Sequence, residues 1–145
     1  MFNLSVKVEY GILGVLALCR HEGPIPLSVR TIAEREDLSL GFLEQAMGRL
    51  KEAGLIESLR GQQGGYRLAM APKEIKLSDV IFAIEGGKRQ KALGKGAASL
   101  KQKMMNEIIN KAETVLTHHL EDINFDHLSA RARALAETEA LMFHI

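Results

Sequence analysis

Apolar residues recur at helical spacing through the first half of the chain, in stretches separated by short polar or glycine- and proline-containing breaks. Residues 4–20 are apolar on most sides of a helix, which predicts a helix buried on several faces. The segment GPIP, residues 23–26, predicts a stiff loop that ends this helix. Apolar residues resume at helical spacing over residues 29–36, and Ser28 before them is a candidate N-cap.

A short break, a further helix and a hairpin follow. Residues 37–39 form the break, and Ser39 is a candidate N-cap for a helix over residues 40–53. Two short apolar runs predict the arms of a hairpin, over residues 55–59 and 66–70. Two helices joined by a tight break and followed by a hairpin are typical of a winged helix-turn-helix.

Residues beyond the hairpin predict three more helices. A short helix over residues 77–84 is capped by Ser78 or its neighbour, and a long helix covers about residues 98–122. An Ala-, Leu- and Arg-rich helix covers residues 127–143. Along the long helix, one set of residues follows the spacing of a seam between packed helices: Met105, Ile108, Ala112, Val115 and His119.

We therefore predict a mainly α fold with a small β-hairpin wing and a long C-terminal dimerisation helix. The winged helix-turn-helix DNA-binding domain covers residues 1–85, a basic glycine-containing linker covers 86–97, and a helical dimerisation region covers 98–145. The seam is too apolar for a helix standing alone. Its residues could be buried against the last helix or across a two-fold axis.

The outward face of the helix over residues 40–53 carries side chains that suit DNA bases. In a winged helix-turn-helix this second helix lies in the major groove. Gln and Arg can read adenine and guanine edges with two hydrogen bonds, Glu can accept from cytosine, and Phe can contact a thymine methyl. An ordinary solvated helix face is the alternative. The candidate residues are Gly41, Phe42, Glu44, Gln45 and Arg49.

The hairpin tip, within ESLRGQQGGYRLA, favours the DNA interpretation. Arg60 has the side chain best suited to a narrow and strongly negative minor groove. Gly61, Gly64 and Gly65 combine small size with freedom of φ, which suits a tip lying against a phosphate backbone. A loose hairpin with a solvated arginine is the alternative. A nucleotide-binding phosphate loop fits poorly, because the required Lys-Ser/Thr does not follow the glycines.

Composition and charge exclude several classes of protein. The net charge is +1, but residues 86–106 carry six Lys/Arg and no acid, so the charge is distributed in patches. No signal peptide or membrane-spanning segment is evident, and we expect a cytoplasmic protein without membrane contact. The basic stretch either is a solvated loop or adds non-specific DNA affinity. No carboxylate pair, nucleophile–base set or metal triad is spaced for catalysis, so we do not expect an enzyme.

Few residues suit a metal. The single cysteine, Cys19, excludes an internal disulfide and an all-cysteine metal site in one chain, and a small core residue is the favoured interpretation. His118 and His119 are adjacent, so on a helix their side chains diverge and cannot share a metal in one chain. His119 could meet its mate across a dimer axis, but a packed or solvated histidine is favoured.

One long stretch carries a family resemblance. SVRTIAEREDLSLGFLEQAMGRLKEAGLIESLRGQQGGYRLA, with KVEYG before it and IKLSDVIFAIEGG behind, resembles the Rrf-two family of bacterial transcriptional regulators. The match runs over about residues 4–87, and LEQ, AGL, RG..GGYRLA and LSDVI.AIEG in this order make it specific. Residues 88–145 share only a long helix with the family.

The resemblance implies a homodimer bound to double-stranded DNA at a partly palindromic operator. By position, Glu44 and Gln45 would contact bases, and Arg60 and Gly61 would enter the minor groove. Gly41 stands where a family member has a DNA-contacting serine, so one contact would be missing, and Glu9 replaces a common basic residue. The candidate phosphate contacts are Lys7, Tyr10 and Ser39, and Ser28 is a further candidate DNA contact.

Family members with an iron–sulfur cluster carry three cysteines just after the EG segment. This chain has none there, so we expect no cluster and no other cofactor. The prediction is a dimeric repressor whose effector is a small molecule, a partner protein or nothing. The alternative is a winged-helix interaction module that binds protein through the same face.

Overall fold

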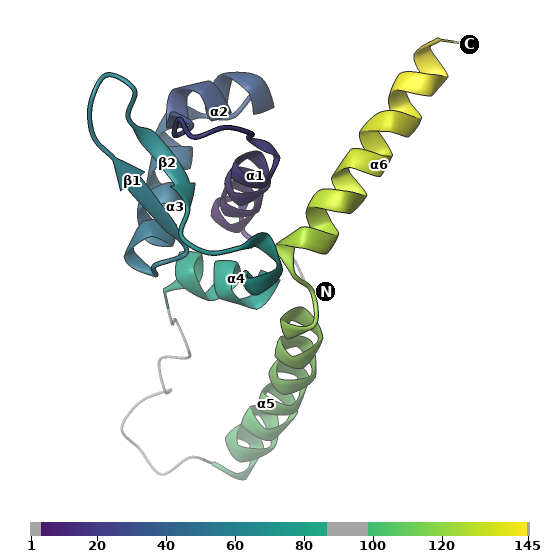
Figure 1. The fold of residues 1–145 in the computed structure, drawn as a ribbon. Helices are drawn as coiled ribbons and strands as arrows, with labels where there is room; N and C mark the ends of the chain where they lie inside the picture. The colour runs from purple at the N-terminus through teal and green to yellow at the C-terminus, as the bar shows by residue number, and fades with distance from the viewer. Residues whose placement is uncertain (1–3, 87–98, 145) are drawn as a thin grey trace.

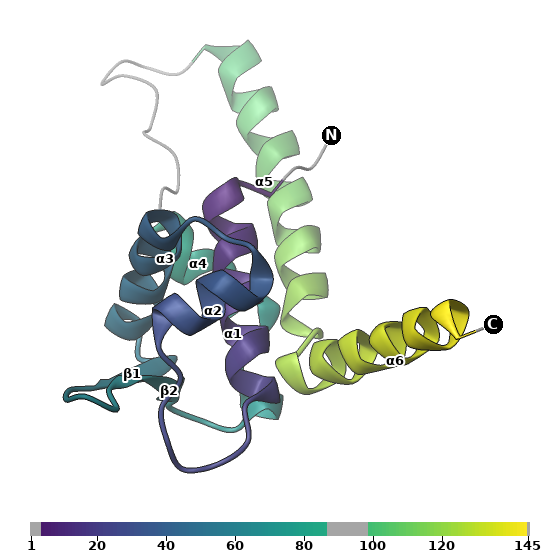
Figure 2. The same ribbon diagram turned by 90° about the horizontal axis from the view of Figure 1, so that it is seen from above.

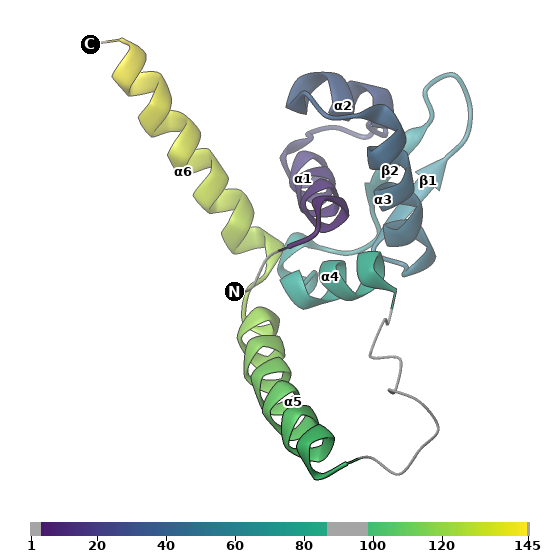
Figure 3. The same cartoon turned by 180° about the vertical axis from the view of Figure 1, so that it is seen from behind.

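A computed structural model describes residues 4–86 and 99–144. The helices α1 to α4 form a domain with the wing on one side, and α6 extends away on the other (Figures 1, 2 and 3). The predicted linker over residues 86–97 lies almost wholly outside the described residues. The elements are α1 Val6–Arg20, α2 Val29–Glu36, α3 Leu40–Glu52, β1 Ile56–Leu59, β2 Gly65–Leu68, the 3₁₀ helix η1 Pro72–Glu74, α4 Leu77–Glu85, α5 Leu100–Glu121 and α6 Phe125–Phe143.

The central helix α1 packs closely against α3 and α4 because two glycines face them. A Cβ at Gly14 would lie 2.7 Å from Sδ of Met47, and a Cβ at Gly11 would lie 3.0 Å from Cδ1 of Ile84. The absence of side chains at these two positions lets the helices approach. This confirms the prediction that the first helix is buried on several sides, although it begins at Val6 rather than at residue 4.

The helix-turn-helix has the predicted form. Its inner residues, among them Ile32 on α2 and Leu43 and Met47 on α3, are fully buried in the core. Between the helices, Asp37 adopts a left-handed conformation with φ of 52°, which turns the chain sharply. Gly54, with φ of 77°, follows the end of α3 as a C-terminal glycine should.

The wing is a two-stranded antiparallel sheet with a third segment bonded to its base. Ile56 pairs with Leu68 at the base of the wing, and Leu59 pairs with Gly65 near its tip. Leu27, in the loop before α2, donates to the carbonyl of Tyr66 at 3.0 Å and accepts from the Tyr66 N–H at 2.8 Å. These two bonds tie the wing to the start of the helix-turn-helix.

The fourth α-helix starts at Leu77 as predicted, but its cap differs from the prediction. Ser78 is not the cap; it lies inside α4 and is buried. The helix begins at Leu77, and the carboxylate of Asp79 accepts the N–H of the N-cap residue Lys76 at 3.0 Å. The N–H of Leu77 donates to the carbonyl of Ile123 at 2.8 Å, so tertiary contacts fix this start.

The turn between α5 and α6 is part of the N-terminal core. Phe125 is fully buried there, and its N–H donates to the carbonyl of Ile75 at 3.0 Å. The last helix begins at Phe125, two residues before the predicted start, because the side chain of Asn124 caps it by accepting the N–H of His127 at 3.0 Å. From this turn, α5 and α6 diverge (Figures 1 and 3).

Candidate nucleic-acid interface

The outward face of α3 is exposed along its whole length. Leu43, Met47 and Leu50 fix the opposite face in the core with no exposed area. Because one face of a helix determines the other, the side chains between these positions must point to solvent. The exposed residues include all five candidates: Gly41, Phe42, Glu44, Gln45 and Arg49.

A small cluster positions the N-terminal end of α3. The hydroxyl of Tyr10, on α1, accepts the backbone N–H of Ser39 at 3.1 Å. The rings of Tyr10 and Phe42 also pack against each other in a T-shaped arrangement, with 6.1 Å between ring centroids and an interplanar angle of 61°. The O–H proton of Tyr10 remains free to be donated, and the side chain of Ser39 makes no capping bond to α3. Two hydroxyl groups are therefore available at the end of α3.

Lys7 lies one helical turn before Tyr10 on α1, and its side chain is exposed. Ser28 differs from these candidates, since its hydroxyl is already used. It accepts the N–H of Thr31 at 3.1 Å and is 2.7 Å from the Thr31 hydroxyl. The structure thus gives Ser28 the capping role that the sequence indicated.

Arg49 extends toward the C-terminal end of α4. A Cβ placed on Gly86 would lie 2.8 Å from Nη1 of Arg49, so the guanidinium lies against this glycine. Gly86 ends α4 with φ of 63°, and its N–H donates to the carbonyl of Phe82. A cation is favourable at a helix C-terminus, where the helix dipole is negative. Arg49 therefore joins α3 to α4.

The wing tip presents an exposed arginine on a tightly folded turn. Arg60 and Gly61 are both exposed, and Gly61 has φ of 119°. Gly64 closes the turn by donating to the carbonyl of Gly61 at 2.9 Å, and a Cβ there would lie 2.5 Å from the carbonyl oxygen of Leu59. Small size at Gly64 is required by the protein's own backbone. The freedom of φ that we predicted for three glycines is used only at Gly61.

The same explanation holds for Gly65. A Cβ there would lie 2.5 Å from the carbonyl oxygen of Leu27, where the loop before α2 crosses the base of the wing. Sequence reasoning missed this contact and the Tyr10–Phe42 pair. The available signal for the pairing of Leu27 with the wing was an apolar residue in the loop before Ser28. If such a residue is buried, its backbone N–H and C=O need hydrogen-bond partners.

The seam of α5 is exposed. Met105 is 54% exposed, Ile108 57% and Val115 71%, and Ala112 and His119 are also exposed. The last helix does not cover these residues, because α6 packs against α1 and η1 instead. Of the two alternatives that the sequence left open, packing against α6 is therefore not what the structure shows.

An exposed polar helix behind a tight turn, with a hairpin wing beside it, defines the class of winged helix-turn-helix proteins. The model of the Rrf2 family, described as iron-dependent transcriptional regulator, matches residues 4–131. The chain belongs to this family. None of the helices within residues 4–86 and 99–144 is long and apolar enough to span a membrane.

Named relatives agree with this assignment. The chain is 43% identical over 85 residues to the HTH-type transcriptional regulator IscR of Aliivibrio salmonicida, a match that covers 57% of this chain and 49% of that protein. It is 38% identical over 84 residues to the HTH-type transcriptional regulator CymR of Bacillus subtilis, covering 58% and 61% respectively. The chain thus spans about half the length of the first of these relatives.

Solved structures share the fold over most of the chain. IscR of T. potens is 31% identical, with a TM-score of 0.70, over 90% of this chain and 88% of that one. CymR of B. subtilis, described as the global cysteine regulator, is 29% identical, with a TM-score of 0.67, over 90% and 98%. The predicted winged helix with a long C-terminal helix is confirmed.

The residues of this chain do not fit an iron–sulfur cluster, although the family description names iron. Such clusters are held mainly by cysteine thiolates, and the sequence contains one cysteine. Cys19 lies half-buried near α6, where burial and then the carboxylate of Asp126 raise the pKa of its thiol to about 11, against a smaller lowering by Arg133. In the described part of the chain, no three His, Cys, Asp or Glu side chains are grouped to hold a metal ion.

Proposed function

We propose that this chain is a DNA-binding transcriptional repressor that acts as a homodimer on a partly palindromic operator. One observation carries the proposal: α3 and the wing lie on the same side of the domain (Figures 1 and 2), and both carry exposed candidates, Glu44 and Gln45 on α3 and Arg60 at the wing tip. A helix and a wing on one side can enter adjacent grooves of one duplex. Its DNA target would place the protein in the cytoplasm.

The proposed contacts fall into two groups, those to the DNA bases and those to the DNA backbone. Glu44 and Gln45 would contact base edges in the major groove, and the exposed edge of Phe42 would meet a thymine methyl group. Arg60, with the compact Gly61 beside it, would enter the minor groove.

Phosphate contacts would surround these base contacts. The free O–H of Tyr10 and the uncapped hydroxyl of Ser39 would donate to one phosphate, and Lys7 would approach the neighbouring backbone. Ser28 would contribute little beyond its cap. Arg49 is not assigned a base, because its guanidinium lies on α4.

The dimer follows from the exposed seam of α5. Apolar residues such as Ile108 and Val115 face solvent in a single chain, and pairing two α5 helices would bury them. Two helix-turn-helix domains on one duplex also need a fixed spacing of about one DNA turn, which a two-fold axis supplies. The seam is thus both the apolar surface to be covered and the means of setting that spacing.

Selection of bound sequences from a random DNA pool tests the proposal directly. We expect enrichment of one motif with two related half-sites whose centres are about one helical turn apart. The control is the same selection with Gln45→Ala, which should relax the base preference at one position per half-site while non-specific binding persists. A pool that stays random after repeated rounds would instead support the protein-interaction module.

A further inference from the structure

A groove of about 500 Å³ lies between the C-terminal end of α1 and α2. Ala17, Leu27 and Ile32 form its apolar wall, and the last two are buried. Its volume is in the range of sites that hold small molecules. The polar residues that line it are Arg20, His21, Glu22, Arg35 and Glu36.

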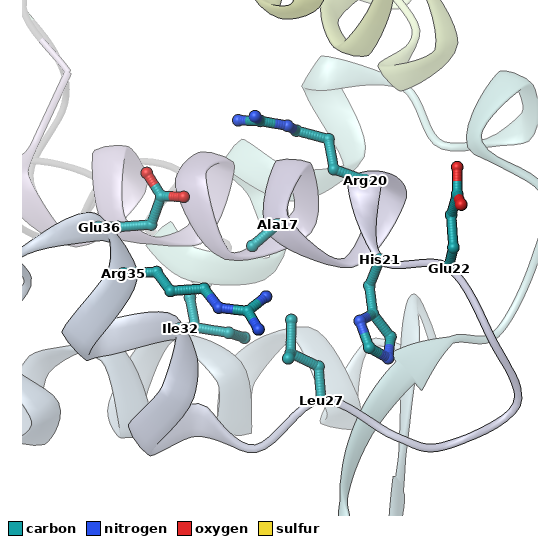
Figure 4. Close-up of a pocket in the computed structure, with 8 residues that line it drawn as sticks. All are labelled: Ala17, Arg20, His21, Glu22, Leu27, Ile32, Arg35 and Glu36. Carbon is teal, nitrogen blue, oxygen red and sulfur yellow. The ribbon is translucent and has the colours of Figure 1, made fainter.

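The charged groups of the groove are arranged unevenly. Figure 4 shows the guanidinium of Arg35 extending along the groove toward Leu27, whereas the carboxylates of Glu36 and Glu22 lie at its two ends. Arg20 lies above α1 in the same view. Within residues 4–86 and 99–144, none of the four charged side chains forms an ion pair. The centre of the groove therefore offers an arginine next to an apolar wall.

His21 is held in a defined orientation at the same place. Its Nε2 is 2.7 Å from the carbonyl oxygen of Ile25, and since a carbonyl can only accept, Nε2–H is the donor. In the neutral ring, Nδ1 is then an acceptor. Figure 4 shows Nδ1 on the side of the ring that faces Leu27.

We propose that this groove binds a small carboxylic acid with an apolar chain and a hydrogen-bond donor on the carbon next to the carboxylate. Arg35 would bind the carboxylate through its planar pair of N–H donors. Nδ1 of His21 would accept from the 2-hydroxyl or 2-amino group, and the chain would lie on Ala17, Leu27 and Ile32. An ammonium group would also be tolerated by the two end carboxylates, whereas a second acid group would not.

A ligand in this groove would touch the parts that position the DNA-binding elements. Leu27 is bonded to Tyr66 of the wing through both backbone groups, and Ile32 and Arg35 belong to the first helix of the helix-turn-helix. Filling the groove would therefore change the placement of α2 and of the wing together. This coupling rests on the proposed function, but binding itself does not.

Titration of the isotopically labelled full chain by NMR tests the binding without DNA. The probes are L-leucine and 2-hydroxy-4-methylpentanoate, with 4-methylpentanoate lacking the donor and 3-methylbutylamine lacking the carboxylate. We expect saturable shifts at Ala17, Leu27 and Ile32 with one or both of the first two probes, weaker binding of 4-methylpentanoate, and none of the amine. Which of the first two binds more tightly distinguishes an amino acid from a hydroxy acid.

Matched variants locate the site. Arg35→Met should lower the affinity about ten-fold or more, since it removes a charge-assisted pair, whereas Arg30→Met, on the same helix but outside the groove, should leave it within about two-fold. Ala17→Leu should block binding by filling the groove while all charges remain. The absence of saturable shifts with every carboxylate, or an equal loss in the two arginine variants, would overturn the proposal.

A second measurement examines the coupling. With the selected operator, a saturating ligand should change the DNA affinity of the unmodified chain and leave that of Ala17→Leu unchanged. Binding with no change in DNA affinity would remove the regulatory part of the proposal. Loss of DNA binding in all samples would count against the proposed function instead.

Discussion

The N-terminal domain and the C-terminal helices differ in how far they bury their apolar residues. In the domain, Val8, Ile32 and Leu43 are fully buried against one another. On α5 and the outer part of α6, Ile108 and Phe143 are 57% and 83% exposed. Exposed apolar surface of this kind is typical of a surface that binds a partner. Within the described residues, the N-terminal domain buries its apolar residues, whereas α5 leaves several exposed, and this difference supports the proposal that α5 pairs across a two-fold axis.

The largest effect is expected where the two regions join. Phe125→Ala should lower the free energy of unfolding by about 3–5 kcal/mol, because it leaves a cavity in the core of the domain. Urea unfolding followed by circular dichroism measures this loss. Phe143→Ala is the control at the other end of the same helix and should change stability by less than about 0.5 kcal/mol. Equal losses would mean that α6 is packed along its full length.

Ile108→Glu tests the seam of α5. It would place like charges opposite each other at a two-fold axis and should weaken dimerisation by about 3 kcal/mol or more. Sedimentation should show a monomer whose N-terminal domain remains folded and whose operator binding is steeply reduced. The matched control is Lys111→Glu, which introduces the same side chain off the seam. A monomer–dimer equilibrium that Ile108→Glu does not move would contradict the seam.

Arg60→Ala tests the wing without disturbing the buried core. Loss of an arginine from the minor groove should weaken specific operator binding by about 1–3 kcal/mol. Arg67→Ala, on the same hairpin, removes an exposed ion pair with Glu57 at 3.0 Å and should have little effect on DNA affinity. Titration by fluorescence anisotropy compares the two. Full-strength binding by Arg60→Ala would remove the wing from the interface.

Gly86→Ala probes the contact between α3 and α4. The substitution requires a left-handed conformation of alanine and displaces the guanidinium of Arg49, so stability should fall by about 1 kcal/mol or somewhat more. Thermal melts of the variants measure this loss. Gly41→Ala is the control, because Gly41 is at an exposed helical position with no neighbour within 4 Å of the added Cβ. It should be neutral or slightly stabilising. A neutral Gly86→Ala would show that Arg49 moves away without cost.

The smallest effect is expected from exposing the purified protein to oxygen, because we expect it to bind no iron–sulfur cluster. Protein made without oxygen should be colourless, without stoichiometric iron or sulfide, and its DNA affinity should not change in air. Its one thiol, with a pKa of about 11, is protonated at neutral pH and loses the proton only as the pH rises toward that value. A brown sample with near-stoichiometric iron and acid-labile sulfide would overturn this expectation.

The helix-turn-helix and the wing could be predicted because their signals are local. Ser28 caps α2 as expected, and the buried spacing of Leu43 and Met47 determines which residues of α3 face outward. The exposure of Glu44 and Gln45 follows from that spacing alone. Helical periodicity therefore sufficed for the candidate base contacts.

Features that depend on distant segments could not be predicted. Ser78 is a good capping residue, but α4 begins at Leu77, whose N–H donates to the carbonyl of Ile123, so Ser78 lies inside the helix. Gly64 and Gly65 suggested room for a nucleic acid, whereas Gly64 is needed inside the turn of the wing and Gly65 where the loop before α2 crosses the base of the wing. No local pattern in the sequence marks the bond from Leu77 to Ile123, because these two residues are far apart in the chain.

Burial of Phe125 also has a consequence for synthesis on the ribosome. This residue, which is buried in the core of the N-terminal domain, emerges only after the whole of α5 has been made. A chain released early, before this residue, would carry a cavity of aromatic size and would be unstable. The order of elements along the chain thus places a residue that the N-terminal core needs after the long helix α5, so a polypeptide that ends before α5 is complete lacks a stable N-terminal core.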